Sequence, residues 1–207
     1  MNVSQQSSKA QDRTLRIWFQ KIQNGDIKLP RFQRFQAWDK RRITSLLETI
    51  SYNLPLGVTL LLEVDEEKFD SRYLATAPET GGRVSEHLLD GQQRLTSLWR
   101  IMNNNYEFET YFIYIPEFDR DENDGLQNDY MMPHCQGRWF KRDKKYPLWA
   151  DDPKACFSKG LIPIHLLRPM DIRNEIDDWI NNAAINFKPI DKTDELFADK
   201  LEEYTEI

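Results

Sequence analysis

The first part of the chain shows apolar residues first at helical and then at extended spacing. Residues 12–24 predict a helix, because four apolar side chains fall on one face: Leu15, Trp18, Phe19 and Ile22. Asp12 is placed to cap its start, and Asn24-Gly25 is a typical stop signal. Residues 27–29 predict a short extended segment that leads into Pro30.

A second amphipathic helix is predicted from Asp39, as its N-cap, to Asn53. Its inward face carries Ile43, Leu46, Leu47 and Ile50. Residues 57–64 form a short, nearly continuous apolar run, which predicts a strand buried on both faces. Residues 65–83 carry Pro78, Gly81-Gly82 and acidic residues, so we expect a surface excursion or an irregular hairpin there.

Residues 84–99 predict a strand, a tight turn and a helix. The strand runs from Val84 to Leu89, and the helix from the turn to about residues 103–105, with an apolar face of Leu95, Leu98, Trp99 and Met102. Gly91 permits a backbone path that a Cβ atom would obstruct. Asp90 is then expected near the N-cap, and Gln92, Gln93 and Arg94 in the first helical turn.

The second half of the chain is less regular. Residues 107–115 predict a strand, residues 161–167 predict extended structure, and residues 172–184 and 193–204 predict helices. Residues 117–160 show no sustained period, so they form either a functional loop or an inserted subdomain. The last predicted helix ends without a clear cap before residue 207, so we expect either that the chain continues into a further C-terminal domain or that this helix packs against a part not contained in these residues.

These elements predict an α/β (α+β) fold with helices on a mixed sheet. We expect a disordered tail (residues 1–11), a core domain (12–116), a long insertion that returns to the core (117–170) and an acidic helical extension (171–207).

No apolar run approaches the roughly 20 residues that span a bilayer. Because no signal peptide is evident either, a cytoplasmic protein is expected. Cys135 and Cys156 lie far apart, which supports neither a disulfide framework nor a metal site.

The net charge of −6 is unevenly distributed. Residues 171–207 hold 11 acidic and 4 basic residues, whereas the first 170 residues are nearly neutral. Two basic clusters are interleaved with aromatic residues, a combination that suits nucleic-acid backbones and bases. Plain solvated surface is the alternative interpretation. The cations predicted to contact DNA are Arg31, Arg34, Lys40, Arg41 and Arg42 in the first cluster, and Lys141, Arg142, Lys144 and Lys145 in the second.

The predicted turn at Gly91 has the features of an anion site. The N-terminus of a helix presents unpaired N–H groups and the positive end of the helix dipole, and Arg94 adds a guanidinium that matches phosphate oxygens. In the loop of residues 29–38, Gln33 and Arg34 could bind the same ligand. Both segments are also compatible with a purely structural role, and we expect Phe32 and Trp38 to anchor the loop to the core.

Three sequence blocks together resemble a known family. They are Leu29-Pro30-x-Phe32-Gln33-Arg34, Leu54-Pro55-x-Gly57, and Leu89-Asp90-Gly91-Gln92-Gln93-Arg94-Leu95-Thr96. They resemble the N-terminal DGQQR domain of GmrSD-type, modification-dependent restriction endonucleases, which also occurs in phosphorothioate-sensing SspE-type phage-defence proteins. The resemblance covers roughly residues 15–115. The sequence departs from the family pattern at Gln36, where an aromatic residue is usual.

The resemblance implies a ParB/sulfiredoxin-like fold and hydrolysis of a nucleoside triphosphate with Mg²⁺, coupled to DNA restriction. The nucleotide-binding residues that it implies are Gln33, Arg34, Asp90, Gly91, Gln92, Gln93, Arg94 and Thr96. Asp90, Gln93 and Arg94 are the implied catalytic residues. The His-bearing nuclease domain of the family is not contained in these 207 residues, so DNA cleavage is not assigned to this chain.

Three functions remain to be compared. The first is a nucleotide-binding and hydrolysing sensor domain of a DNA restriction system, with modified or foreign DNA, nucleotide and a nuclease domain or subunit as partners and no membrane. The second is a non-catalytic DNA-binding module whose pocket accepts a backbone phosphate or a flipped modified base. The third is an interaction scaffold whose acidic tail binds a partner subunit.

Overall fold

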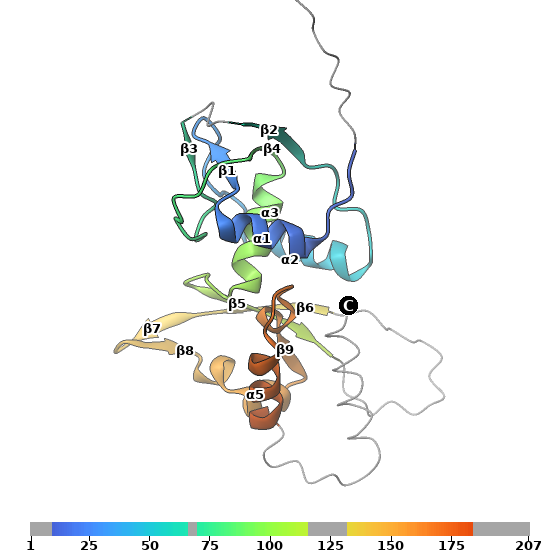
Figure 1. Cartoon of the computed structure of the whole chain (residues 1–207). Helices are drawn as coiled ribbons and strands as arrows, with labels where there is room; N and C mark the ends of the chain where they lie inside the picture. Colours follow the sequence, from blue (N-terminus) through green and yellow to red (C-terminus); the bar gives the residue numbers. More distant parts are fainter. Residues whose placement is uncertain (1–9, 66–69, 116–131, 184–207) are drawn as a thin grey trace, which may run out of the picture.

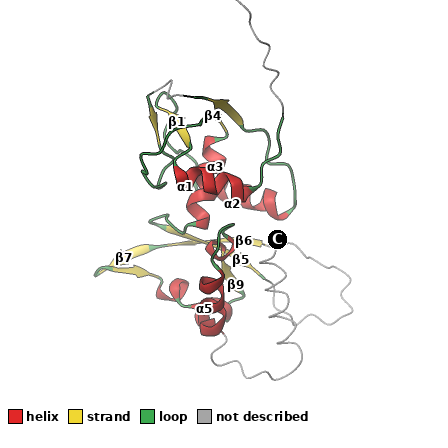
Figure 2. Ribbon diagram, viewed as in Figure 1, coloured by secondary structure: helices red, strands yellow, loops and turns green. Residues whose placement is uncertain are grey.

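The computed structural model describes residues 10–65, 70–115 and 132–183. The fold is mixed α/β, as the sequence predicts. The first helices of the chain are α1 (Leu15–Asn24), α2 (Lys40–Ser51) and α3 (Gln92–Met102). Figures 1 and 2 show these helices in the middle of the molecule, with one sheet on one side of them and a second sheet on the other. Among the described residues, no helix has the length and apolar content needed to cross a bilayer.

The first sheet is mixed and has the strand order β2-β4-β1-β3. The strands are β1 (Ile27–Pro30), β2 (Leu60–Glu63), β3 (Ser71–Arg72) and β4 (Glu86–Asp90). β1 and β4 are parallel, with Ile27 opposite Glu86, whereas β2 and β3 run antiparallel to their neighbours. Helices α1 and α3 pack on this sheet through a buried cluster that includes the rings of Phe19 and Trp99, 5.1 Å apart.

The second sheet has the order β6-β5-β9 and is antiparallel. It consists of β5 (Glu109–Tyr114), β6 (Met132–Gly137) and β9 (Leu161–Pro163). A hairpin of β7 (Trp139–Lys141) and β8 (Lys144–Tyr146) extends from β6 (Figure 1). Two 3₁₀ helices (Leu148–Asp151 and Ile164–Leu167), α4 (Pro153–Phe157) and α5 (Arg173–Ala183) complete this part.

A buried cluster joins the helices to the second sheet. Ile43 and Leu47 of α2 and Ile101 of α3 pack against Tyr111 of β5 and Ile164. A further cluster around Phe112 and Trp179 lies between the second sheet and α4 and α5. The strand predicted at residues 107–115 pairs on one side with β6, from the region that shows no sequence period, and on the other side with β9, from the predicted extended segment. The helices form a shared layer between the two sheets.

Several predicted boundaries need correction. Thr14, not Asp12, caps α1 through its hydroxyl, which accepts the N–H of Ile17. Asp39 caps α2 as predicted and accepts the N–H of Arg42 at 3.0 Å. Ile50 was predicted to face inward but is exposed, because the buried stripe of α2 consists of Ile43, Leu46 and Leu47.

The strand predicted within residues 57–64 is not buried on both faces. β2 lies at the edge of the first sheet, and Val58 just before it is 81% exposed. An apolar run alone does not distinguish an interior strand from an edge strand, and only β4 flanks β2.

Of the predictions for the C-terminal part, one is confirmed and one is correct only in its first half. The helix predicted at residues 172–184 is α5, to within one residue at each end. Residues 161–167 were predicted to be extended, but only the strand β9 is, and the rest form a 3₁₀ helix. The helix predicted at residues 193–204 and most of the predicted tail at residues 1–11 lie outside the described residues.

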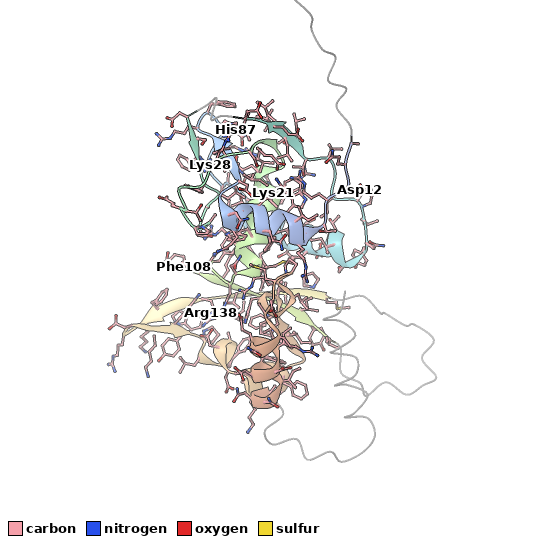
Figure 3. All side chains as sticks on the ribbon, in the orientation of Figure 1. Asp12, Lys21, Lys28, His87, Phe108 and Arg138 are labelled. Atoms are coloured by element: carbon pink, nitrogen blue, oxygen red, sulfur yellow. The ribbon has the colours of Figure 1, made fainter. Side chains whose placement is uncertain are left out.

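A buried ion cluster joins α1 to β4. The carboxylate of Glu86 accepts two hydrogen bonds from the Arg13 guanidinium, at 2.7 and 3.0 Å, and pairs with Lys21 Nζ at 3.1 Å. Lys21 lies on α1 in Figure 3. Burial alone would raise the pKa of Glu86, but the hydrogen bonds and charges of Arg13 and Lys21 outweigh it and hold the pKa below its ordinary value.

We predict that Glu86→Gln lowers the free energy of unfolding at pH 7 by about 3 kcal/mol, because two partly buried cations lose their counter-charge. Because the folded pKa is depressed, the carboxylate stabilises the fold above its unfolded pKa and loses this effect as pH falls through the folded pKa. Urea denaturation from pH 7 to pH 3 should therefore show a smaller loss of stability for Glu86→Gln than for the unmodified chain. Parallel curves for the two proteins would show that the cluster does not contribute.

Candidate functional site

The turn between β4 and α3 adopts the predicted strand–turn–helix path. Gly91 has φ = 91° and occupies the N-cap position of α3, with no side chain that caps the helix. A Cβ atom on Gly91 would also lie 3.0 Å from Oγ1 of Thr59. Glycine is therefore required both by the left-handed backbone and by the close approach of the neighbouring chain. Asp90, predicted near the N-cap, is the last residue of β4.

The start of α3 presents unpaired N–H groups. The first main-chain hydrogen bond of the helix joins the N–H of Leu95 to the carbonyl of Gly91 at 3.0 Å. Within the described part of the chain, no acceptor contacts the N–H groups of Gln92, Gln93 or Arg94. The helix dipole adds positive potential at this end, so the turn favours an anion.

A cavity of about 320 Å³ opens at this turn. Its volume lies at the lower end of the range of small-molecule pockets, roughly 300–1,000 Å³. The lining contains seven residues that the sequence assigns to the nucleotide, together with Trp38 and Leu89: Gln33, Arg34, Asp90, Gly91, Gln92, Gln93 and Arg94. Thr96 does not belong to this lining and is only 1% exposed, so the structure does not bring it to the cavity.

Three glutamine side chains of the cavity hold its two walls together. Gln33 Nε2 donates to the carbonyls of Leu88 and Leu89 at 2.6 and 2.9 Å. Gln92 Nε2 donates to the carbonyl of Arg34 at 2.9 Å. Gln93 Nε2 donates to the carbonyl of Phe35 at 3.2 Å, and its Oε1 accepts the N–H of Ala37 at 2.8 Å. These amides fix residues 33–37 against the β4–α3 turn, a role that the sequence analysis missed.

Arg94 also takes part in this framework. Its guanidinium donates to the carbonyls of Leu56 and Val58 and lies 3.7 Å from the carboxylate of Asp90. Gly57 has φ = 85°, and a Cβ atom there would lie 2.5 Å from Nη1 of Arg94. The Leu54-Pro55-x-Gly57 block therefore provides a backbone that Arg94 can approach closely.

Arg34 differs from Arg94, because its side chain is exposed and has no acceptor or ion-pair partner within residues 10–65, 70–115 and 132–183. Its main chain is held in place: Arg72 donates to the Arg34 carbonyl at 2.9 Å and lies 4.6 Å from the centre of the Phe35 ring. Arg34 thus combines a fixed backbone with a guanidinium that is available to a ligand.

The carboxylate of Asp90 is the acidic group of the cavity and is 73% exposed. In the described part of the chain, no group of three or more His, Cys, Asp or Glu residues is arranged to hold a metal ion. A divalent cation at this cavity would therefore need ligands from a bound phosphate in addition to Asp90.

Gln36 belongs to a polar network behind the cavity loop. Its Nε2 donates to the hydroxyl of Tyr106 at 2.6 Å, and its Oε1 accepts from Arg100 at 2.8 Å. The Arg100 guanidinium lies 3.9 Å from the centre of the Tyr106 ring. Burial raises the pKa of Tyr106, which keeps its hydroxyl protonated. The polar residue at this position therefore links the cavity loop to the segment after α3.

Three of the cations that were predicted to contact DNA have partners within the protein. Arg31 pairs with Asp70 at 3.3 Å, and Lys40 donates to the carbonyl of Cys135 at 3.2 Å. Lys145 donates to the carbonyl of Tyr106 at 3.1 Å. The remaining predicted DNA-binding cations are exposed and have no side-chain partner in the described part of the chain: Arg34, Arg41, Arg42, Lys141, Arg142 and Lys144.

We predict that Gln93→Leu releases residues 35–37 from α3, because the loop loses both hydrogen bonds of this amide. The expected loss in unfolding free energy is about 1–3 kcal/mol, since the N–H of Ala37 and the carbonyl of Phe35 lose their partner. Amide hydrogen exchange at Ala37 should accelerate, whereas the exposed control Gln20→Leu should leave it unchanged. Unaltered exchange at Ala37 in the Gln93 variant would show that this amide does not hold the loop.

Comparisons with known proteins agree with the sequence blocks. The chain matches the family described as "GmrSD restriction endonuclease, N-terminal domain" over residues 15–205. The match extends well beyond the three blocks and includes the second sheet and the hairpin.

One curated relative is the uncharacterized protein MJ0686 of Methanocaldococcus jannaschii, which is 32% identical over 105 residues. The match covers 47% of this chain and 16% of that protein, so this chain corresponds to a small part of the relative's length. No solved structure matches the chain. The family match over most of the sequence, together with the DGQQR turn at the cavity, establishes that the chain belongs to the family of GmrSD restriction endonuclease N-terminal domains.

Proposed function

We propose that the chain binds a nucleoside triphosphate with Mg²⁺ at the β4–α3 turn and hydrolyses it as the sensor domain of a DNA restriction system. The observation that carries this proposal is that one cavity is lined both by Arg34, whose guanidinium has no partner among the described residues, and by the three residues at the start of α3 whose N–H groups are unpaired. The family match supports the restriction context. The mixed sheet followed by a helix at the glycine turn is compatible with a ParB/sulfiredoxin-like domain, which we propose as the fold type.

The proposed phosphate site combines neutral and charged donors. The N–H groups of Gln92, Gln93 and Arg94 supply hydrogen bonds and the dipole of α3, while Arg34 supplies a full positive charge. The N–H donors are preorganised, and the backbone that carries Arg34 is fixed beside them, because Gln33, Gln92 and Gln93 hold the loop and the turn together. Preorganised donors stabilise charge that develops in a transition state more effectively than donors that must first reorient.

Asp90 is the residue that we assign to the metal and to the attacking water. Mg²⁺ in such sites is held by one or two carboxylates together with the phosphates of the substrate, and it neutralises negative charge on them. Asp90 fits this requirement, since its carboxylate is exposed at the cavity and the nearest cation, Arg94, lies 3.7 Å away. Its other proposed task is to accept a hydrogen bond from the water that attacks the terminal phosphate.

Gln93 and Arg94 receive positioning roles in this proposal instead of direct catalytic ones. The Gln93 amide bonds to the main chain at both of its ends, and the Arg94 guanidinium bonds to the backbone of residues 56–58. Arg94 still contributes positive potential at the cavity, which it lines. Variants of either residue are therefore expected to reduce nucleotide binding through the geometry of the site.

We predict that Arg34→Ala weakens triphosphate binding by about 10- to 100-fold, the equivalent of a hydrogen bond to a charged group. Isothermal titration calorimetry with a series of triphosphates and Mg²⁺ measures this loss. Arg34→Lys should restore part of the affinity, because the charge returns without the two-pronged geometry. The exposed Arg16→Ala serves as the matched control and should bind as the unmodified chain does.

We predict a different pattern for Asp90→Asn. Phosphate release should fall by about 100-fold or more, whereas triphosphate affinity measured without Mg²⁺ should stay equal or increase, because a negative charge leaves the cavity. If Arg34→Ala and Asp90→Asn both retained normal affinity and turnover, the nucleotide site would not lie at this turn.

The exposed aromatic residues beside the cavity favour a second candidate function, a non-catalytic DNA-binding module. Phe32 was expected to anchor the loop to the core, but its side chain is 73% exposed, and that of Phe35 is 76% exposed. Both rings could therefore contact a flipped or modified base while Arg34 holds a backbone phosphate. Titration of the same variants with modified and unmodified duplexes distinguishes the two functions. Loss of DNA affinity in Arg34→Ala, without any binding of triphosphate by the unmodified chain, would favour this alternative.

A further inference from the structure

The hairpin of β7 and β8 extends away from the rest of the molecule (Figure 1). Arg142 and Asp143 connect its strands and both have left-handed backbones, with φ of 50° and 59°. Two left-handed residues between paired strands are typical of a type I′ turn, whose twist matches that of a hairpin. The arm is therefore a regular two-stranded ribbon with two defined faces.

One face of the ribbon is used within the protein. Because side chains alternate along a strand, the opposed residues Phe140 and Lys145 share this face. The Phe140 ring packs edge-on against Phe108 at 6.4 Å between centroids, and Lys145 donates to the carbonyl of Tyr106. Both contacts involve the segment that joins α3 to β5, so this face points toward the body of the protein.

The opposite face carries an aromatic pair and a lysine pair. Trp139 lies opposite Tyr146, and their rings stack at 6.2 Å with an angle of 16° between planes. Lys141 lies opposite Lys144. Like charges directly opposite each other destabilise a strand pair, and neither lysine has an ion-pair partner in the described part of the chain. An external anion between these lysines would relieve their repulsion.

The base of the hairpin is held by Arg138, which is only 4% exposed. Its guanidinium donates to the hydroxyl of Thr110 at 2.8 Å and to the carbonyl of Tyr146 at 3.2 Å, and it forms an ion pair with Asp151. Figure 3 shows Arg138 and Phe108 near the root of the arm. The buried charge of Arg138 is therefore neutralised by Asp151. Through these contacts Arg138 fixes the base of the hairpin, which carries Lys141, Arg142 and Lys144 nearer its tip.

We propose that the outer face of the β7–β8 hairpin binds the phosphate backbone of double-stranded DNA through Lys141, Arg142 and Lys144. A two-stranded ribbon fits the major groove of B-DNA, which is about 12 Å wide. Arg142 at the tip provides a guanidinium that suits phosphate oxygens. Trp139 and Tyr146 stack on each other, which closes one face of each ring to a base.

The cations of the hairpin matter for DNA binding because the chain as a whole is negatively charged. The net charge is −6, so the protein as a whole repels a polyanion. The tip and outer face of the hairpin carry three exposed cations against one acidic residue, Asp143. This arm is separate from the cavity at the β4–α3 turn, and the proposal does not depend on nucleotide binding there.

The test is a salt series of DNA affinity for a triple variant, Lys141→Gln/Arg142→Gln/Lys144→Gln, in the full chain. Fluorescence anisotropy with a labelled duplex gives the slope of log affinity against log salt. Loss of three phosphate contacts should reduce the magnitude of this slope by about 2.7. Between about 50 and about 200 mM salt, the unmodified chain should then lose about 40-fold more affinity than the variant.

The matched control removes the same number of charges from exposed sites elsewhere: Arg16→Gln/Lys154→Gln/Arg173→Gln. It should keep the slope of the unmodified chain, and both triple variants should keep the unmodified response to triphosphate. If the hairpin variant does not fold, Arg142→Gln alone replaces it, with an expected slope change of about 0.9.

Three results would overturn the proposal. The first is a decrease of the salt slope in the control variant as large as that in the hairpin variant. The others are a preference of the unmodified chain for single-stranded over duplex DNA, and displacement of the duplex by polyglutamate at equal charge concentration. Triphosphate binding is measured on the same proteins. The experiment therefore distinguishes a hairpin that does not bind DNA from a cavity that does not bind triphosphate.

Discussion

The hydrogen bonds between three glutamine side chains and main-chain groups are the interaction on which the candidate site depends. Gln33 joins the loop to β4, while Gln92 and Gln93 join α3 to the loop. Amides suit this task because each offers both donors and an acceptor without a charge that needs neutralisation. The two walls of the cavity, far apart in sequence, thereby become one framework, and the backbone of Arg34 keeps a fixed position relative to the N–H donors at the start of α3.

This framework continues beyond the cavity. The loop that Gln93 holds also contains Gln36, whose contacts with Tyr106 and Arg100 reach the segment between α3 and β5. The carbonyl of Tyr106 accepts a hydrogen bond from Lys145 at the inner face of the hairpin. The cavity and the basic arm are thus attached to the same segment, and the helices between the two sheets provide a common core for both.

The sequence predicts the part of this arrangement that depends on local chemistry. Gly91, the helix after it and the loop of Gln33 and Arg34 could be found because glycine, apolar periodicity and cations have distinct local signals. The partners of the glutamine side chains could not be found, because an amide binds a backbone as readily as a ligand. The burial of Arg138 could not be predicted from the sequence either, because its partner Asp151 lies in a segment without periodicity. β2 was misplaced because an edge strand and an interior strand can share the same apolar run.

The central claim is that the main-chain donors of the β4–α3 turn and Arg34 bind phosphate groups. The most direct measurement is a titration of the ¹⁵N-labelled chain with a nucleoside triphosphate and Mg²⁺, followed by amide chemical shifts. If phosphate binds at this turn, the N–H groups of Gln92, Gln93 and Arg94 shift saturably and the hairpin amides change less. Saturable binding that leaves these three amides unshifted would contradict the central claim.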